Sequence, residues 1–152
     1  MEKTVCFREF ETRDIDFIYK CKNDEKLNSM IVGHFKPFSY EDAENWVHGC
    51  MGDHDSYKFW AIATNDDEKR IIGWASLSNI DRYNQSAHFH GIVIGDKNYN
   101  DGRAWIESYL FILNYVFDVL CINRLTGSHL VDHPMSGAIA AAMYFDIEGI
   151  FK

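Results

Sequence analysis

The sequence has no cluster of basic residues. Its 152 residues include 15 Lys and Arg against 23 Asp and Glu, which gives a formal net charge of −8. Nucleic-acid-binding proteins normally carry a basic face that contacts phosphates, so this balance argues against nucleic acid as a partner. It is compatible with an amine or a basic peptide as substrate, and also with a surface that only keeps the protein in solution.

Long apolar runs are missing as well. No stretch of about 18 apolar residues could cross a membrane, and no apolar signal segment stands at the N-terminus. The cysteines form no C-x-x-C pair, so we expect reduced thiols and neither a disulfide frame nor a zinc knuckle; they are Cys6, Cys21, Cys50 and Cys121. These absences predict a cytoplasmic protein without a membrane partner.

The sequence has few features that would mark a domain boundary. It has two prolines, Pro37 and Pro134, and no repeat, low-complexity segment or flexible linker. A chain of this length without an internal boundary predicts one domain over residues 1–152.

Apolar periodicity and turn residues predict ten elements. The expected strands cover residues 5–10, 58–64, 70–80, 85–94 and 124–131, and a last strand is expected within 145–151. The expected helices cover residues 14–23, 39–50, 104–120 and 136–143. Caps are assigned to Thr12 or Asp14, to Ser39 and to Ser136.

The order of these elements predicts an α+β (mixed α/β) fold. Short turns join the three middle strands into antiparallel hairpins. A helix then connects the strand at 85–94 to the strand at 124–131, and such a crossover makes the two strands parallel. We therefore expect a mixed, mostly antiparallel twisted sheet, flanked by helices, with one β-α-β unit.

Four segments resemble a known family. They are IGWASLSNID at 72–81, AHFHGIVI at 87–94, YNDGRA at 99–104 and FDIEG at 145–149. In this order and spacing they resemble the GNAT superfamily of N-acetyltransferases, most closely the branch of ribosomal-protein and amino-sugar N-acetyltransferases. The resemblance covers nearly the whole chain and implies acetyl-CoA as co-substrate, with no metal.

The resemblance places the pyrophosphate of acetyl-CoA at the start of the helix near Gly102. The implied contacts are Tyr99, Asn100, Asp101, Gly102, Arg103 and Ala104. Small residues let the backbone amides of a helix start approach phosphates, and Arg103 adds a positive charge. Tyr99 stands where the family usually has Arg or Gln, and Asp101 brings a negative charge that should weaken binding.

Two further cofactor contacts are implied by the resemblance. The pantetheine arm would pair with the free edge of the strand at 85–94, where the amides of Ile92, Val93 and Ile94 would polarise the thioester carbonyl. At the start of the last helix, His133 stands in the place of a CoA-contacting Asn, with Ser136 as the cap.

The candidate catalytic residues are His88, His90 and Tyr144. The acceptor amine must lose a proton, and a His whose pKa lies near neutrality suits this role. His88 and His90 alternate on one face of their strand, and His88 occupies the position of a Glu in many relatives. The family's acid, a Tyr on the last helix, falls on Ala140; Tyr144 lies one turn later and could replace it, or pack in the core.

The expected activity is transfer of an acetyl group to a primary amine of a small molecule or a peptide N-terminus, by direct attack in a ternary complex. Acceptor contacts would come from Asn28, Ser29, His34, Phe35 and Phe38. One alternative is a catalytically silent domain that binds acyl-CoA or another protein. The other is a metal-binding domain that uses His88 and His90, joined by His129 and His133.

Relatives commonly continue past the Glu-Gly turn into another strand, whereas this sequence stops at Lys152. A missing strand would expose an edge of the sheet, which a second copy could cover. A homodimer is therefore one expectation for the assembly.

Overall fold

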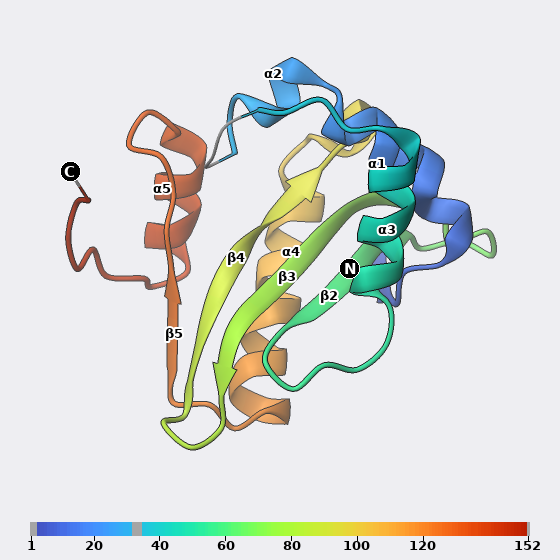
Figure 1. Cartoon of the computed structure of the whole chain (residues 1–152). Helices are drawn as coiled ribbons and strands as arrows, with labels where there is room; N and C mark the ends of the chain where they lie inside the picture. Colours follow the sequence, from blue (N-terminus) through green and yellow to red (C-terminus); the bar gives the residue numbers. More distant parts are fainter. Residues whose placement is uncertain (1–2, 32–34, 152) are drawn as a thin grey trace.

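A five-stranded sheet is the centre of the fold in the computed structural model, which describes residues 3–31 and 35–151. Its strands, in sheet order, are β1 (Val5–Arg8), β2 (Lys58–Thr64), β3 (Ile71–Asp81), β4 (Ser86–Ile94) and β5 (Arg124–Gly127). β1 to β4 pair antiparallel, and β5 joins β4 in parallel. The predicted mixed sheet with its β-α-β unit is confirmed (Figure 1).

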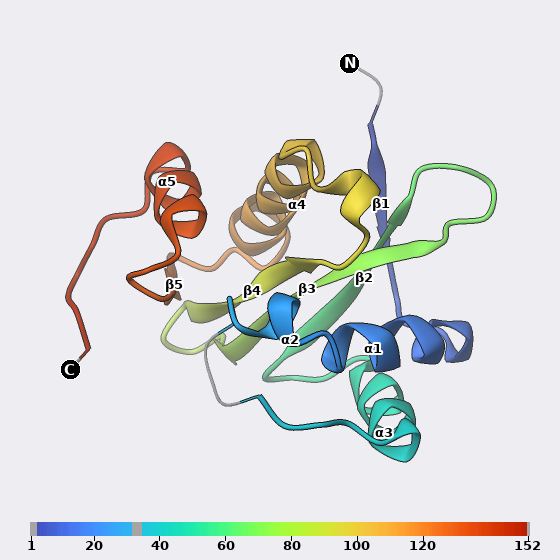
Figure 2. The same cartoon turned by 90° about the horizontal axis from the view of Figure 1, so that it is seen from above.

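Helices cover both faces of this sheet. One face carries α1 (Ile15–Lys22), α2 (Glu25–Asn28) and α3 (Tyr40–Cys50), whereas α4 (Arg103–Asn114) and α5 (Pro134–Ala142) lie on the other (Figure 2). Single 3-10 turns cover Thr12–Asp14 and Lys97–Tyr99. Within the described residues, no helix is long and apolar enough to cross a membrane.

Each face of the sheet has its own apolar core. Toward α4, side chains such as Leu77 and Phe89 pack with Tyr109 and Ile112 of the helix. Toward α1 and α3, the buried cluster comprises Phe10, Ile15, Ile18, Cys21, Ala43, Val47, Cys50, Ala61, Ile71 and Trp74. Because neighbouring residues of a strand face opposite sides, the two cores alternate along β2, β3 and β4.

The caps predicted for the first two helices have different outcomes. Ser39 does cap α3, in a capping box with Asp42. Asp14, which is only 1% exposed, makes no cap bond to α1. Its two carboxylate oxygens each lie 2.8 Å from a guanidinium nitrogen of Arg8, and one also accepts from the amide of Glu11. The charge of Asp14 therefore joins β1 to the start of α1.

Edge strand β1 is also attached to α4. The carboxylate of Glu107 accepts hydrogen bonds from the backbone amides of Thr4 and Val5, at 3.0–3.1 Å. These amides stand just before and at the first residue of β1. The beginning of the strand is thus fixed to the helix that crosses behind it.

The C-terminal third departs most from the expected elements. β5 ends at Gly127, so the expected extension to residue 131 is wrong. Residues 143–151 contain no strand, and the prediction of a last strand is wrong too. β5 is itself an edge of the described sheet, and an ion pair between Arg124 and Glu148 (2.6 Å) holds the last segment beside it. An extended segment becomes a strand only where another strand bonds to its backbone.

The long helix of the β-α-β unit changes type near its end. Its α-helical part ends at Asn114, and Tyr115–Val119 continue as a π-helix, with the amide of Leu120 bonded to Tyr115 O at 2.9 Å. The sequence predicted one α-helix over 104–120. Since the apolar face continues through both parts, periodicity cannot show this change.

Candidate active site

The sheet opens between β4 and β5. These strands pair only from Ser86↔Arg124 to Phe89↔Gly127. β4 then runs on to Ile94, and its edge has no strand partner on this side among the described residues. Figure 1 shows α5 and the connecting segment beside this opening. A strand edge exposed in the middle of a sheet is available for pairing with an extended ligand.

A β-bulge marks the point at which the strands separate. Ser76 of β3 pairs with Gly91, but the next residue, Leu77, pairs with Phe89, so His90 has no partner in β3. Gly91 has a φ of 132°, and a Cβ there would meet no atom within 4 Å. Glycine is required here by backbone conformation and not by crowding.

The free edge of β4 presents alternate amides. Gly95 N donates to Ile72 O at 2.9 Å, which fixes the phase of the antiparallel ladder with β3. The amide of Val93 then also faces β3, whereas those of Ile92 and Ile94 face the free edge. Of the three residues predicted to contact the thioester, Ile92 and Ile94 have the amides in position to do so.

The turn before α4 has the predicted form. Gly102 is the N-cap, with a φ of 89° and open space around its missing Cβ. The amide of Arg103 donates a hydrogen bond to the carboxylate of Asp101 at 3.0 Å. Ala104 is fully buried, but Gly102, Arg103 and Trp105 keep exposed surface. An anion can therefore reach this helix start, and Asp101 competes with it for one amide.

The two residues before Asp101 support the turn. The ring of Tyr99 packs on the core beneath α4, and Asn100 Oδ1 accepts a hydrogen bond from Trp105 Nε1 at 3.2 Å. Both side chains thus hold the loop in place. Tyr99 does not supply the positive charge that Arg would bring to this position.

His88 lies where β4 and β5 are still paired. Its neighbours Ala87 and Phe89 are buried toward α4, so His88 faces the other side of the sheet. Its Nδ1 is 3.1 Å from the hydroxyl oxygen of Thr126, its register partner on β5. When that hydroxyl donates to Ala87 O, which is 3.4 Å away, Nδ1 of His88 carries the ring hydrogen and Nε2 is an acceptor. Sequence reasoning missed Thr126, because the register of a parallel pair cannot be read from the chain.

Burial lowers the pKa of His88 below its usual value, and the nearby positive charge of His90 lowers it further. The two rings are 6.4 Å apart, and His90 is exposed at the bulge. A His kept neutral in this way can accept a proton at neutral pH. The expected grouping of the two histidines on one face holds, and His88 has the environment of a base.

The residues predicted at the end of the chain differ from expectation. Tyr144 is 95% exposed with a φ of 63°, so it is not packed in the core, and no contact joins it to His88 or His90 in the described structure. His133, not Ser136, is the N-cap of α5: its Nδ1 accepts from Ser136 N at 3.2 Å. The helix starts earlier than expected because Pro134 fits its first position, where no amide hydrogen is needed.

The structure describes part of the segment that was predicted to contact the acceptor. Asn28, Ser29, Phe35 and Phe38 belong to α2 and the segment that follows it, on the face that carries His88. His34 lies outside the described residues. Asn28 uses its side-chain amide to hold three backbone carbonyls of residues 21–24, so its role is structural.

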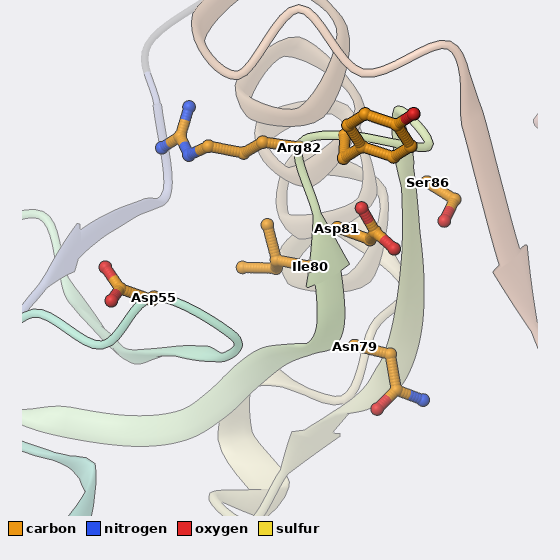
Figure 3. A pocket seen from close by; sticks show the side chains of 7 residues that line it. Asp55, Asn79, Ile80, Asp81, Arg82 and Ser86 are labelled. Atoms are coloured by element: carbon orange, nitrogen blue, oxygen red, sulfur yellow. The ribbon is translucent and has the colours of Figure 1, made fainter.

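A hollow of about 640 Å³ lies at the β3–β4 hairpin. Asp55, Asn79, Asp81, Arg82 and Ser86 are among its lining residues (Figure 3). Both carboxylate oxygens of Asp81 are bonded to the backbone and side chain of Asn84 in the turn. The hollow lies at the start of β4, whereas the turn at Gly102 follows the end of β4.

The geometry gives little support to the alternative of a metal-binding domain. Over residues 3–31 and 35–151, no three His, Cys, Asp or Glu side chains are placed to hold an ion. His129 Nδ1 lies 2.9 Å from Leu130 O, and His133 caps α5. That the reaction needs no metal stays a prediction.

A parallel strand pair that separates at a bulge, with a glycine-started helix after the first strand, defines an acyl-CoA-dependent transferase fold. Residues 4–145 match the acetyltransferase (GNAT) domain family, so the chain belongs to this family of N-acetyltransferases. The predicted superfamily is confirmed. No curated protein sequence matches the chain.

Solved structures show the same fold at low identity. An acetyltransferase of the GNAT family from Bacillus anthracis is 21% identical with a TM-score of 0.82, over 100% of this chain and 86% of that chain. The spermidine N-acetyltransferase from Vibrio cholerae, in complex with CoA and spermine, is 21% identical with a TM-score of 0.80, over 96% and 83%. At this distance the likeness concerns the fold.

Proposed function

We propose that this chain transfers the acetyl group of acetyl-CoA to a primary amine, of a small molecule or a peptide N-terminus, by direct attack in a ternary complex. The observation that carries the proposal is the position of His88 beside the opening between β4 and β5, on the face opposite α4. Acetyl-CoA supplies an acetyl group that is already activated as a thioester. The chain has to bind it, orient the amine and take one proton.

Residues at the opening are suited to these tasks. The amides of Ile92 and Ile94 on the free edge would donate hydrogen bonds to an extended arm and to a carbonyl oxygen that gains negative charge. Gly102 and Arg103 would hold the diphosphate. His88 Nε2, oriented by the bond from Nδ1 to Thr126, would accept the proton of the amine.

A thiol-release assay with a panel of amines tests the proposal. The panel contains amino sugars, polyamines, amino acids and peptides, because membership of the ribosomal-protein and amino-sugar branch is still a prediction. We expect His88→Ala to lower kcat/KM by about a hundredfold or more and His90→Ala to have a smaller effect. If neither variant slows transfer at saturating acetyl-CoA, the assignment of the base is wrong.

A catalytically silent acyl-CoA-binding domain is the second candidate. It is favoured by the exposure of Tyr144, which leaves no described tyrosine at the place of the family's acid, and by the bond between Asp101 and the amide of Arg103. Calorimetry separates the two candidates. CoA binding without thiol release from any amine would support the silent domain.

A further inference from the structure

The ammonium group of Lys22 lies in a cluster of aromatic rings. Lys22 is the last residue of α1, and its Nζ is 4.7 Å from the ring centroid of Trp46, 5.3 Å from that of Trp74 and 5.7 Å from that of Phe38. These rings come from α3, β3 and the segment before α3. We call Phe38, Trp46 and Trp74 the aromatic cluster. Ring faces attract a cation, and they hold this one in place.

This ammonium has no counter-ion in the described part of the chain. No carboxylate lies within 4.0 Å of it, although lysines and arginines elsewhere make six such pairs with acidic side chains. Burial lowers the pKa of Lys22, opposed by the neighbouring thiols of Cys50 and Cys21. The described structure has no fully buried side-chain nitrogen without a hydrogen-bond partner, so the ammonium of Lys22 keeps some contact with solvent. A half-buried cation without a partner favours an anionic ligand.

The position of Lys22 relates it to the candidate active site. Trp74, under the ammonium, pairs across the sheet with Val93 of β4. The end of α1 also packs closely against the residue that follows β4, since a Cβ at Gly95 would lie 2.4 Å from Cys21 Sγ and 2.9 Å from the ring of Phe17. Lys22 therefore lies over Trp74 of β3, near the end of β4, and on the face to which His88 points.

The aromatic cluster is held in its arrangement before any ligand binds. Asn23 Oδ1 accepts from the amide of Phe38, and Asn23 Nδ2 donates to Phe38 O, both at 3.0 Å. The rings of Trp46 and Trp74 pack edge-on, with their centroids 5.8 Å apart. A site with fixed walls loses little entropy when it binds a ligand.

We propose that Lys22 is the anion-binding residue of the acceptor site, and that the acceptor is a primary amine that also carries a carboxylate, as an amino acid does. The proposal rests on the proposed function. The carboxylate would supply the counter-ion that the fold leaves out, and the amine of the same molecule would extend from Lys22 across the face of β4. A polyamine would bring a second positive charge next to Lys22 and is disfavoured.

Pairs of acceptors that differ only in a carboxylate test this proposal. Each pair is an amino acid and its carboxamide, and the measured quantity is the ratio of their kcat/KM values. We expect Lys22→Met to lower the acid-to-amide ratio by about tenfold, the value of one charged hydrogen bond, and Lys22→Arg to retain most of it. Lys20→Met, at an exposed position of the same helix, is the matched control and should leave the ratio unchanged.

Binding measurements keep this test separate from the proposed function. CoA-saturated protein is titrated by calorimetry with the N-acetylated acid and the N-acetylated amide, which requires no turnover. Tighter binding of the acid that is lost in Lys22→Met supports the anion site even if no amine is acetylated, which would refute only the enzymatic proposal. An unchanged CoA affinity in Lys22→Met shows that the anion is not a phosphate of CoA.

Three results would overturn the inference. They are a wild-type protein without preference for the acid, a preference that survives in Lys22→Met, and spermine as the better acceptor in both proteins. Circular dichroism shows whether Lys22→Met is folded. If it is not, Lys22→Gln gives the same comparison with a polar side chain.

Discussion

Removing the negative charge of Asp101 should strengthen acetyl-CoA binding. Its carboxylate accepts a hydrogen bond from the amide of Arg103, at the helix start that is proposed to bind the diphosphate. Two unit charges about 6 Å apart in water repel by about 0.7 kcal/mol. Two phosphate charges double this to about 1.4 kcal/mol, and physiological salt roughly halves it. We therefore expect Asp101→Asn to lower the Kd for CoA by about three- to tenfold.

Two variants separate charge from capping. Asn can still accept the hydrogen bond from Arg103, so Asp101→Asn should keep the stability of α4, whereas Asp101→Ala should lower the free energy of unfolding by about 1 kcal/mol. Asp118 is exposed near the other end of the long helix, about 25 Å away, so Asp118→Asn is the control for a change in overall charge.

Calorimetry at low and high salt provides the decisive measurement. The gain in affinity for Asp101→Asn should be largest at low ionic strength and nearly vanish at about 1 M salt, where the screening length is about 3 Å. An affinity that is unchanged at low salt would refute the reasoning. It would mean that the diphosphate does not bind at the start of α4.

Three further predictions concern the base, the bulge and the buried ion pair. Since the pKa of His88 is lowered, the acidic limb of the pH profile of kcat/KM should have its midpoint below about 6.5, and His90→Ala should move it to higher pH because one positive neighbour is removed. Gly91→Ala should cost about 1–3 kcal/mol of unfolding free energy and reduce acetyl transfer more than CoA binding, as thermal melts and kinetics would show. Asp14→Ala leaves the largely buried guanidinium of Arg8 with only the more distant carboxylate of Glu11, at 3.7 Å, and should lower the free energy of unfolding by about 3 kcal/mol in urea titrations.

The bulge and the buried ion pair each have a control variant. Gly127→Ala places a Cβ at an ordinary contact distance, 3.5 Å from Phe89 O, so it should change little. Asp53→Asn removes one member of the exposed pair with Lys58 and should cost less than about 1 kcal/mol. A midpoint above 6.5, a neutral Gly91→Ala, or equal losses from the buried and exposed pairs would each contradict its prediction.

Elements whose signals are local could be predicted from the sequence. Ser39, with acidic residues in the following turn, predicted the start of α3, and the apolar run at 58–64 before the polar turn at 65–68 predicted the bounds of β2. The glycine before Arg103 marked the start of α4. The last strand was predicted from residue type alone, but a strand needs a neighbour, and residues 145–151 have none in the described structure.

Only those features of the site that lie within a single strand or turn could be predicted from the sequence. Alternation placed His88 and His90 on one face, and this holds. The bulge at His90, the hydrogen bond to Thr126 and the cation at Trp46 and Trp74 depend on how distant segments pair and pack. No spacing along the chain encodes these contacts, so they require the folded structure.

The hydrogen bonds from the amides of Thr4 and Val5 to Glu107 link the start of β1 to the helix that is proposed to bind the cofactor. Glu107 is in the first half of α4, whose opening turn is assigned to the diphosphate. A ligand that steadies this helix should also slow hydrogen exchange at Thr4 and Val5, which belong to no part of the site. A reporter dye placed at residue 3 could therefore sense occupancy without entering the substrate path.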